Sequence, residues 1–170
     1  MIRFWASILG GAVSALLGFG ATLLVENWRH QRQRAAIIKA LQREINHNNS
    51  IIQNMIKEEL RDDGGFGSRL TSLQTSSYLK ARDSMVIAEF SASRYEEVST
   101  VYQTILEIKR LIDSGIRISG RVNPQDKDKV FYARGIDSKG FEHPIIGIEQ
   151  LPQRLSLLLA SFEKPSRNKE

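Results

Sequence analysis

Residues 4–25 read FWASILGGAVSALLGFGATLLV and contain no charged side chain. A helix of this length rises about 33 Å, at about 1.5 Å per residue, which is close to the hydrocarbon thickness of a bilayer. A single segment can satisfy its backbone hydrogen bonds inside lipid only as a helix. The stretch therefore predicts a membrane-spanning helix, with residues 1–28 as a transmembrane anchor in the lipid bilayer.

A cleaved signal peptide is the alternative interpretation of this stretch. Such peptides have an apolar core of roughly 7 to 15 residues followed by small residues. Here the apolar run is longer, and Trp28, Arg29 and His30 follow it. Trp5 and Trp28 would lie about 35 Å apart on a helix, which places one indole ring at each membrane interface. The two tryptophans therefore favour an anchor over a cleaved leader.

The basic residues around the span indicate its orientation. Arg29, Arg32 and Arg34 follow the span, whereas only Arg3 precedes it. Because basic residues near a span are retained in the cytoplasm, we expect a single-pass protein of the cell inner membrane with its N-terminus outside and its C-terminal domain cytoplasmic. The absence of cysteine is compatible with a reducing compartment. The three arginines either bind anionic lipid headgroups or serve as topology determinants only.

Small residues recur at every fourth position of the span, and Gly10, Ser14 and Gly18 form the centre of this row. Such a row permits close contact between two helices in lipid, where association depends on van der Waals packing. The row predicts contact with a second copy of the chain or with another membrane protein. The alternative is ordinary composition, because glycine and alanine are common in membrane helices.

Residues 29–61 predict a long helix that continues from the span. Its apolar side chains recur at spacings of three and four, at Ile38, Leu41, Ile45, Ile52 and Met55. Asn48 occupies the polar position in this stripe. In a homomeric coiled coil it would bond to its own copy and fix the register, and otherwise we expect a solvated side chain. Additional apolar residues widen the stripe, which favours packing in a helical bundle.

The remainder of the chain predicts a cytoplasmic domain, residues 29–163, that combines helices with a small sheet. Residues 62–68 contain three glycines and predict a reversing loop. Ser93 and Glu96 form a capping box at the start of a helix. The expected helices are 29–61, 69–81, 93–113 and 152–162, and the expected strands are 116–122, 129–136 and 143–148. Residues 85–90 stay unassigned, and residues 164–170 are expected to form a disordered tail. The predicted fold class is mostly α with a small antiparallel β-meander (α+β).

Few residues indicate catalytic or metal chemistry. Glu44 and His47 have the three-residue spacing of a di-iron site in a helical bundle, but no second such pair exists. We therefore expect both on a solvated helical face. The chain has neither a cysteine nucleophile nor a Gly-x-Ser-x-Gly motif. The sequence predicts no enzyme, no cofactor and no metal site.

Basic and aromatic residues alternate around the predicted strand 129–136, as on surfaces that bind single-stranded nucleic acid. They are Lys127, Lys129, Phe131, Tyr132 and Arg134. Three aspartates interrupt this positive charge. A strand of this kind is more often half core and half solvated, so nucleic acid is not the favoured partner.

The segments VENWR (residues 25–29) and LQREINHN (residues 41–48) together resemble a pattern in uncharacterised bacterial single-pass membrane proteins. In that pattern a span ends near Asn-Trp, and a basic stretch and a Leu-x-x-Glu motif follow. The resemblance covers about the first 50 residues. It implies a bacterial inner-membrane anchor on a helical domain and brings no established activity.

Three classes of function agree with these features. The leading hypothesis is a membrane-anchored, oligomeric scaffold or accessory protein that acts through protein contacts at the inner membrane. The first alternative is a membrane-bound sensor or effector that binds an anionic ligand or lipid. The second alternative is an oligomeric pore, for which the span offers few polar side chains.

Overall fold

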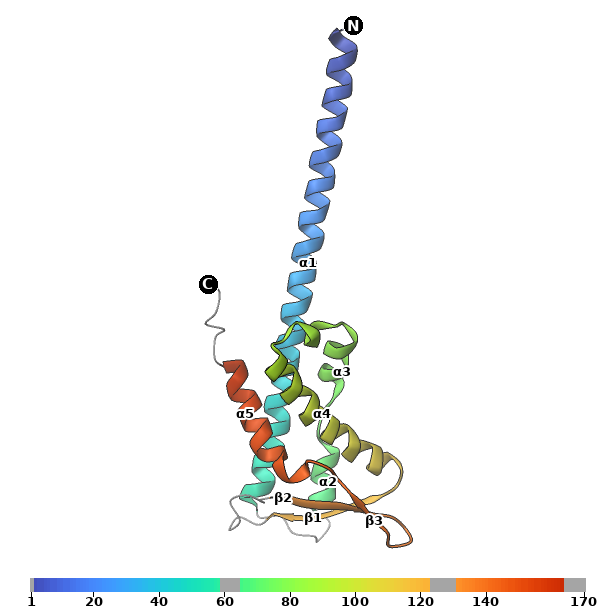
Figure 1. Cartoon of the computed structure of the whole chain (residues 1–170), viewed down its shortest axis with the longest axis vertical. Coiled ribbons are helices and arrows are strands. Elements are labelled where there is room, and N and C mark those ends of the chain that lie inside the picture. The colour runs from blue at the N-terminus through green and yellow to red at the C-terminus, as the bar shows by residue number, and fades with distance from the viewer. Residues whose placement is uncertain (1, 59–64, 123–130, 164–170) are drawn as a thin grey trace. The chain divides into compact units, whose positions relative to one another are not determined.

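The computed structural model describes residues 2–58, 65–122 and 131–163, with the side chains of residues 18–58, 65–122 and 132–162 (Figure 1). Helices dominate the described chain, and three short strands form one antiparallel sheet. This arrangement confirms the predicted mostly α structure with a small β-meander. In chain order the elements are α1 (Ile2–Lys57), α2 (Gly65–Thr71), α3 (Ser76–Asp83), the 3-10 helix η1 (Val86–Glu89), α4 (Ala92–Asp113), β1 (Arg117–Val122), β2 (Phe131–Ile136), β3 (Glu142–Pro144), the 3-10 helix η2 (Ile148–Gln150) and α5 (Leu151–Glu163).

Most predicted elements have a counterpart in this order. The helices expected at 93–113 and 152–162 correspond to α4 and α5, and the first two expected strands correspond to β1 and β2. The helix expected at 29–61 is the later part of α1. The third strand is shorter than expected, since β3 ends at Pro144, where proline cannot donate a ladder hydrogen bond. Residues 85–90 contain η1, and the expected tail 164–170 lies outside the described residues.

Three local predictions are wrong. Residues 65–68 belong to helix α2 rather than to a loop, and the single helix expected at 69–81 is divided between α2 and α3. Burial of Phe66 and Leu70 offsets the conformational cost of the glycines in α2. Helix α4 is capped by Ser91 rather than Ser93, because the Ser91 Oγ accepts a hydrogen bond from the Arg94 N–H at 3.4 Å.

The chain divides into two compact units, residues 1–37 and residues 38–170. In the first unit α1 exposes large apolar side chains, including Phe19, Leu24 and Trp28. Within the described part of the chain, no helix combines the length and the apolar character needed to cross a membrane. The side chains of residues 2–17, which form most of the expected span, lie outside the described residues. The span at residues 4–25 therefore stays a prediction.

Apolar faces of α1, α4 and α5 build the core of the second unit. The expected stripe on α1 is fully buried at Leu41, Ile45, Ile52 and Met55. The buried apolar side chains of α4 and α5 are Val98, Val101, Tyr102, Ile105, Ile108, Leu111, Leu151, Leu155 and Leu158. Each large buried side chain contributes about 1.5–3 kcal/mol, so this apolar contact is the main force that holds the helices together. Packing of this kind agrees with the expected helical bundle.

Two polar side chains of α1 are buried in the same stripe and bind the segment around the start of α3. Asn48 donates from Nδ2 to the Gln74 carbonyl and accepts at Oδ1 from the Gln74 N–H, each at 2.8 Å. Glu44 accepts from the N–H of Ser77 at 2.7 Å and from the N–H of Tyr78 at 3.1 Å. The Glu44 carboxylate therefore caps α3, whose first N–H groups have no partner within the helix. We call these contacts of Glu44 and Asn48 the polar clasp.

The polar clasp contradicts the expectation that Glu44 and Asn48 are solvated. Glu44 is 3% exposed and Asn48 is 0% exposed, and buried polar groups of this kind require hydrogen-bond partners. Asn48 directs its amide to Gln74 rather than to a copy of itself. His47 is exposed, as expected for a solvated helical face, whereas Glu44 is buried against the start of α3.

Two tyrosine rings extend the polar clasp toward α4. Tyr78 and Tyr102 stack with 4.2 Å between ring centroids and 3° between ring planes. Burial raises the pKa of the Tyr102 hydroxyl far above its usual value, and the negative charge of Glu44 raises it further. Tyr102 is therefore an uncharged phenol at physiological pH. Through these contacts α1, α3 and α4 are held together.

The three strands are arranged in the order β1-β2-β3, each antiparallel to its neighbour. The register pairs Ser119 with Arg134 and Arg121 with Tyr132. Directly opposed residues of antiparallel strands project from the same face, and so do residues two apart along a strand. Ser119, Arg121, Tyr132 and Arg134 therefore share one face of the sheet.

The opposite face of the sheet is covered by α2 and by the C-terminal part of α4 (Figure 1). A Cβ at Gly120 would lie 2.6 Å from the Phe66 ring, and a Cβ at Gly135 would lie 3.4 Å from the Leu111 side chain. Gly120 therefore lets α2 approach β1 more closely than any other residue would permit. This close packing holds β1 and β2 in place. Their other face, with Arg121 and Arg134, is called the arginine-bearing face.

We expect Asn48→Ala to lower the free energy of unfolding by about 2–3 kcal/mol. The substitution removes two part-buried hydrogen bonds between the Asn48 amide and the Gln74 backbone, each worth about 0.5–1.5 kcal/mol, and it leaves a cavity where the fully buried amide packs. Urea unfolding of the full chain in detergent, followed by circular dichroism, measures the change. Asn46→Ala is the matched control, because Asn46 is exposed on the same helix. A loss for Asn48→Ala no larger than that of the control would contradict the role of the polar clasp.

Candidate ligand-binding face of the sheet

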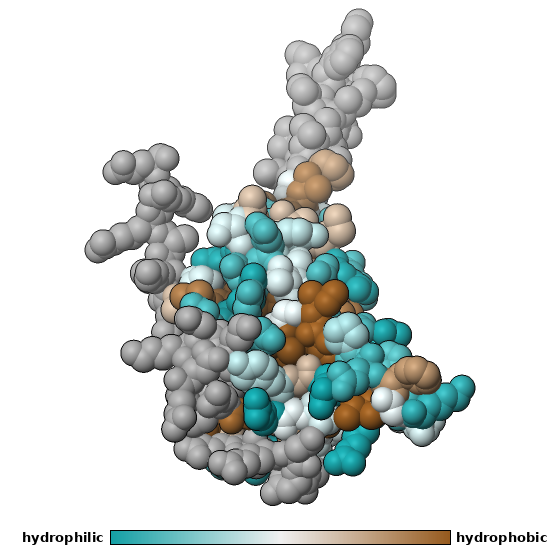
Figure 2. Space-filling view, turned by 60° about the horizontal axis from the view of Figure 1, so that its bottom comes forward, coloured by the Kyte–Doolittle hydropathy of each residue, from teal (hydrophilic) through white to brown (hydrophobic). Residues whose placement is uncertain are grey.

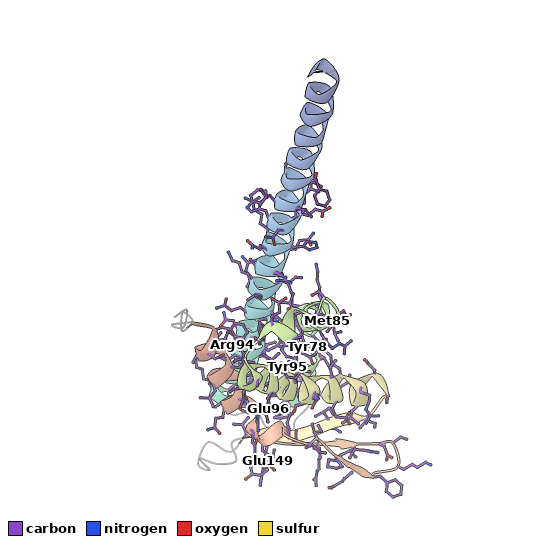
Figure 3. All side chains as sticks on the ribbon, turned by 45° about the horizontal axis from the view of Figure 1, so that its top comes forward. Tyr78, Met85, Arg94, Tyr95, Glu96 and Glu149 are labelled. Carbon is purple, nitrogen blue, oxygen red and sulfur yellow. The ribbon has the colours of Figure 1, made fainter. Side chains whose placement is uncertain are left out.

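The arginine-bearing face of the sheet is hollowed. The hollow has a volume of about 510 Å³ and lies among β1, β2 and η2. This volume is within the range of sites that hold small ligands or a few side chains of a partner. Figure 3 shows Glu149 of η2 near the strands, at the far end of the second unit from Tyr78 and Met85. The hollow is lined by Ser119, Gly120, Arg121, Tyr132, Ala133, Arg134 and Glu149.

A cation and an aromatic ring lie together at one end of this hollow. The guanidinium carbon of Arg121 is 5.6 Å from the centroid of the Tyr132 ring. This distance is within the range of cation–π attraction, which holds the guanidinium over the ring. Tyr132 is half-buried, whereas Arg121 is exposed. The pair therefore offers a positioned positive charge that a ligand can reach.

The second arginine of the hollow already has an acidic neighbour. Arg134 Nη1 donates to Glu142 Oε1 at 2.5 Å, and both side chains are more than half exposed. Ion pairs at such exposed positions contribute roughly 0–1 kcal/mol. Arg134 can therefore exchange Glu142 for a ligand carboxylate or phosphate at little cost. Glu149 adds an exposed carboxylate to the same lining.

A second hollow adjoins the first and has a volume of about 580 Å³. It shares Ala133, Arg134 and Glu149 with the first hollow and extends to the loop between β3 and η2. Figure 2, which turns the sheet end toward the viewer, shows hydrophilic side chains around separate hydrophobic patches. We call the two adjoining hollows the sheet groove.

One apolar side chain stands out in the lining of the second hollow. Ile146 is 86% exposed, although its backbone is held in place. The Thr104 hydroxyl donates to the Ile146 carbonyl at 3.2 Å, and the adjacent Gly147 has a φ of +81°, which favours glycine. The loop, held by these two features, thus presents an isoleucine to solvent at the end of the groove opposite Arg121 and Tyr132.

The turn between β2 and β3 is held by Asp137. Its Oδ1 accepts hydrogen bonds from the N–H of Lys139 at 2.8 Å and of Phe141 at 2.9 Å. The Phe141 N–H is the main reason that the pKa of Asp137 is lowered, with the Lys139 N–H and His143 adding to the effect. His143 Nε2 lies 3.5 Å from Asp137 Oδ2. These contacts stabilise the turn, and they position β3, the strand that carries Glu142.

The lining of the sheet groove combines charged, aromatic and apolar groups. Among the described residues, no group of three or more His, Cys, Asp or Glu side chains is placed to hold a metal ion. The groove instead offers a cation on a ring, two carboxylates and an exposed isoleucine. Groups of these kinds are common in surfaces that contact charged and apolar groups of other molecules.

The membrane-related residues singled out in the sequence all belong to the first unit. The side chains of Trp5, Gly10 and Ser14 lie outside the described residues, and a Cβ at Gly18 would meet nothing within 4 Å. Trp28 is 53% exposed, and the guanidinium carbon of Arg32 lies 3.5 Å from its ring centroid. Arg29 and Arg34 are also exposed. Their roles as membrane contacts and topology determinants stay predictions.

The structure brings together only part of the expected nucleic-acid surface. Lys127 and Lys129, and the side chain of Phe131, lie outside the described residues. Tyr132 and Arg134 share the hollow with Arg121, which was not among the expected site residues. The sequence does show that Ser119 and Arg121 fall on one face of the expected strand 116–122. Only the strand register, which the sequence alone does not provide, places Arg121 opposite Tyr132.

Comparison of the chain with protein-family models, with curated proteins and with solved structures gives no significant match. The assignment of function therefore depends on the geometry of the groove and on the sequence features of the first unit.

We expect the β2–β3 turn to loosen in acid. Because the pKa of Asp137 is lowered in the folded chain, its stabilisation is complete above the usual aspartate value of about 4 and is lost as the pH falls through the lowered value. Amide protection factors of Lys139 and Phe141, measured by NMR from about pH 6 to about pH 2, should therefore fall. Asp137→Asn is the control of equal size. An identical pH dependence in both proteins would exclude Asp137 as the cause.

Proposed function

We propose that the protein is a single-pass, membrane-anchored accessory protein whose cytoplasmic domain binds an anionic partner in the sheet groove. The observation that carries this proposal is the position of Arg121 over Tyr132 in a hollow that also contains Arg134. A preorganised cation beside an aromatic ring is a frequent anchor in protein interfaces. In this proposal residues 1–28 are the anchor, and the second unit, residues 38–170, is the binding module.

The anchoring part of the proposal is supported by the uncharged run at residues 4–25 and by the groups that follow it. Trp28 and Arg32 form a stacked pair, and both side chains suit the interface between lipid headgroups and water. The lipid bilayer is therefore one partner in this account. Anionic headgroups are candidate ligands of Arg29, Arg32 and Arg34.

Self-association is a second element of the proposed function. Gly10, Ser14 and Gly18 recur at four-residue spacing, and small residues at this spacing permit close helix contact in lipid. Contact along this row would bring two sheet grooves into one assembly. Two linked grooves would hold a partner more firmly than one groove.

The composition of the complex extracted gently from native membranes, with a tag after Glu170, tests the proposal. We expect the full chain to co-purify with a reproducible second component, which is lost from Arg121→Glu because charge reversal repels an anionic partner. Arg82→Glu is the matched control, since Arg82 is an exposed arginine of α3.

Native mass spectrometry would identify the components. A lone monomer or a homo-oligomer without a second component would overturn the binding function, and so would equal retention of that component by the two variants.

A further inference from the structure

The sheet groove has two chemically different ends. At one end Arg121 lies over Tyr132, and at the other Pro144 and Ile146 are exposed. Arg134 and Glu149 belong to both hollows and therefore lie between these ends. A ligand that fills the whole groove must match a cation at one end and an apolar surface at the other.

We propose that the sheet groove binds an extended segment of a partner protein, with a carboxylate at Arg121 and an apolar side chain against Ile146 and Pro144. This inference rests on the proposed function and names the chemical class of its partner. Arg121 pairs with Tyr132, and Pro144 pairs with Arg134 two residues along β2, so an extended segment that advances about 3.3 Å per residue needs only a few residues to contact both anchors.

Charge complementarity supports a carboxylate at the Arg121 end. Arg134 is neutralised in part by Glu142, whereas the guanidinium of Arg121 lies on a ring. Arginine binds carboxylates through two parallel hydrogen bonds, and a ring beneath it leaves those donor edges accessible. An aspartate or glutamate of the partner is therefore the matching group.

The apolar end has the character of an interface anchor. An exposed isoleucine alone has no special meaning on a protein surface. Ile146 differs because the Thr104 hydroxyl and the turn at Gly147 fix its backbone, so binding costs little conformational entropy at this position. Contact with a second apolar side chain would remove both from water.

The acidic groups of the groove favour a peptide over a nucleic acid. Glu142 and Glu149 would repel a phosphate backbone, and Tyr132 is the one aromatic ring in the described lining. Single-stranded nucleic acid is bound by a positive groove with several stacking rings. The same carboxylates can accept hydrogen bonds from the backbone N–H groups of an extended peptide.

Selection from a library of random 12-residue peptides, displayed against the full chain in lipid nanodiscs, tests this inference without a known ligand. We expect enrichment of peptides that carry an acidic and an apolar residue a few positions apart. Their dissociation constants should rise about tenfold or more in Arg121→Glu and, separately, in Ile146→Asp. Both positions are exposed, so neither substitution should disturb folding.

Arg82→Glu and Leu157→Asp are the matched controls, because both positions are exposed on helices that do not line the groove. Absence of enrichment over empty nanodiscs, or equal binding by the groove variants and the controls, would overturn the inference.

A labelled dT15 oligonucleotide and ATP are the phosphate probes. If either bound through Arg121 while no peptide did, the peptide inference would fail and the anionic-partner function would stand. If neither a peptide nor a phosphate probe bound, both would fail.

Discussion

The burial of Glu44 and Asn48 in the apolar face of α1 is the constraint on which the second unit depends. A buried carboxylate and a buried amide are costly without hydrogen-bond partners, and the segment from Gln74 to Tyr78 supplies those partners. Apolar contacts alone would permit several registers between α1 and its neighbours. The directional bonds select one register, and the Tyr78–Tyr102 stack extends it to α4.

Helix α4 in turn positions the sheet. Strand β1 follows α4 after a short turn, and close contacts at Gly120 and Gly135 press the strands against α2 and α4. One face is thereby rigidly supported, while the other face carries the groove. Binding sites on well-packed elements hold their side chains in place before the partner arrives, which reduces the entropic cost of binding. The positions of the side chains that line the sheet groove therefore depend on packing against the opposite face of the sheet.

The sequence predicted the elements whose signals are local and missed those that depend on distant contacts. The apolar stripes of α4 and α5 and the β-branched strands were visible directly. Helix α2 was missed because its glycines indicate a loop, whereas burial of Phe66 and Leu70 against the rest of the unit stabilises the helix. Glu44 and Asn48 were misassigned because their partners lie 26–34 residues away. Arg121 was missed because its meeting with Tyr132 depends on strand register.

We propose that function is determined at the sheet groove rather than at the anchor, and photo-crosslinking in native membranes tests this most directly. A photoreactive phenylalanine analogue would replace Tyr132, Ile146 or, as the control, Leu157 of the full chain. We predict that positions 132 and 146 crosslink to the same protein and that position 157 does not. No product from the groove positions, or the same product from all three, would contradict the account.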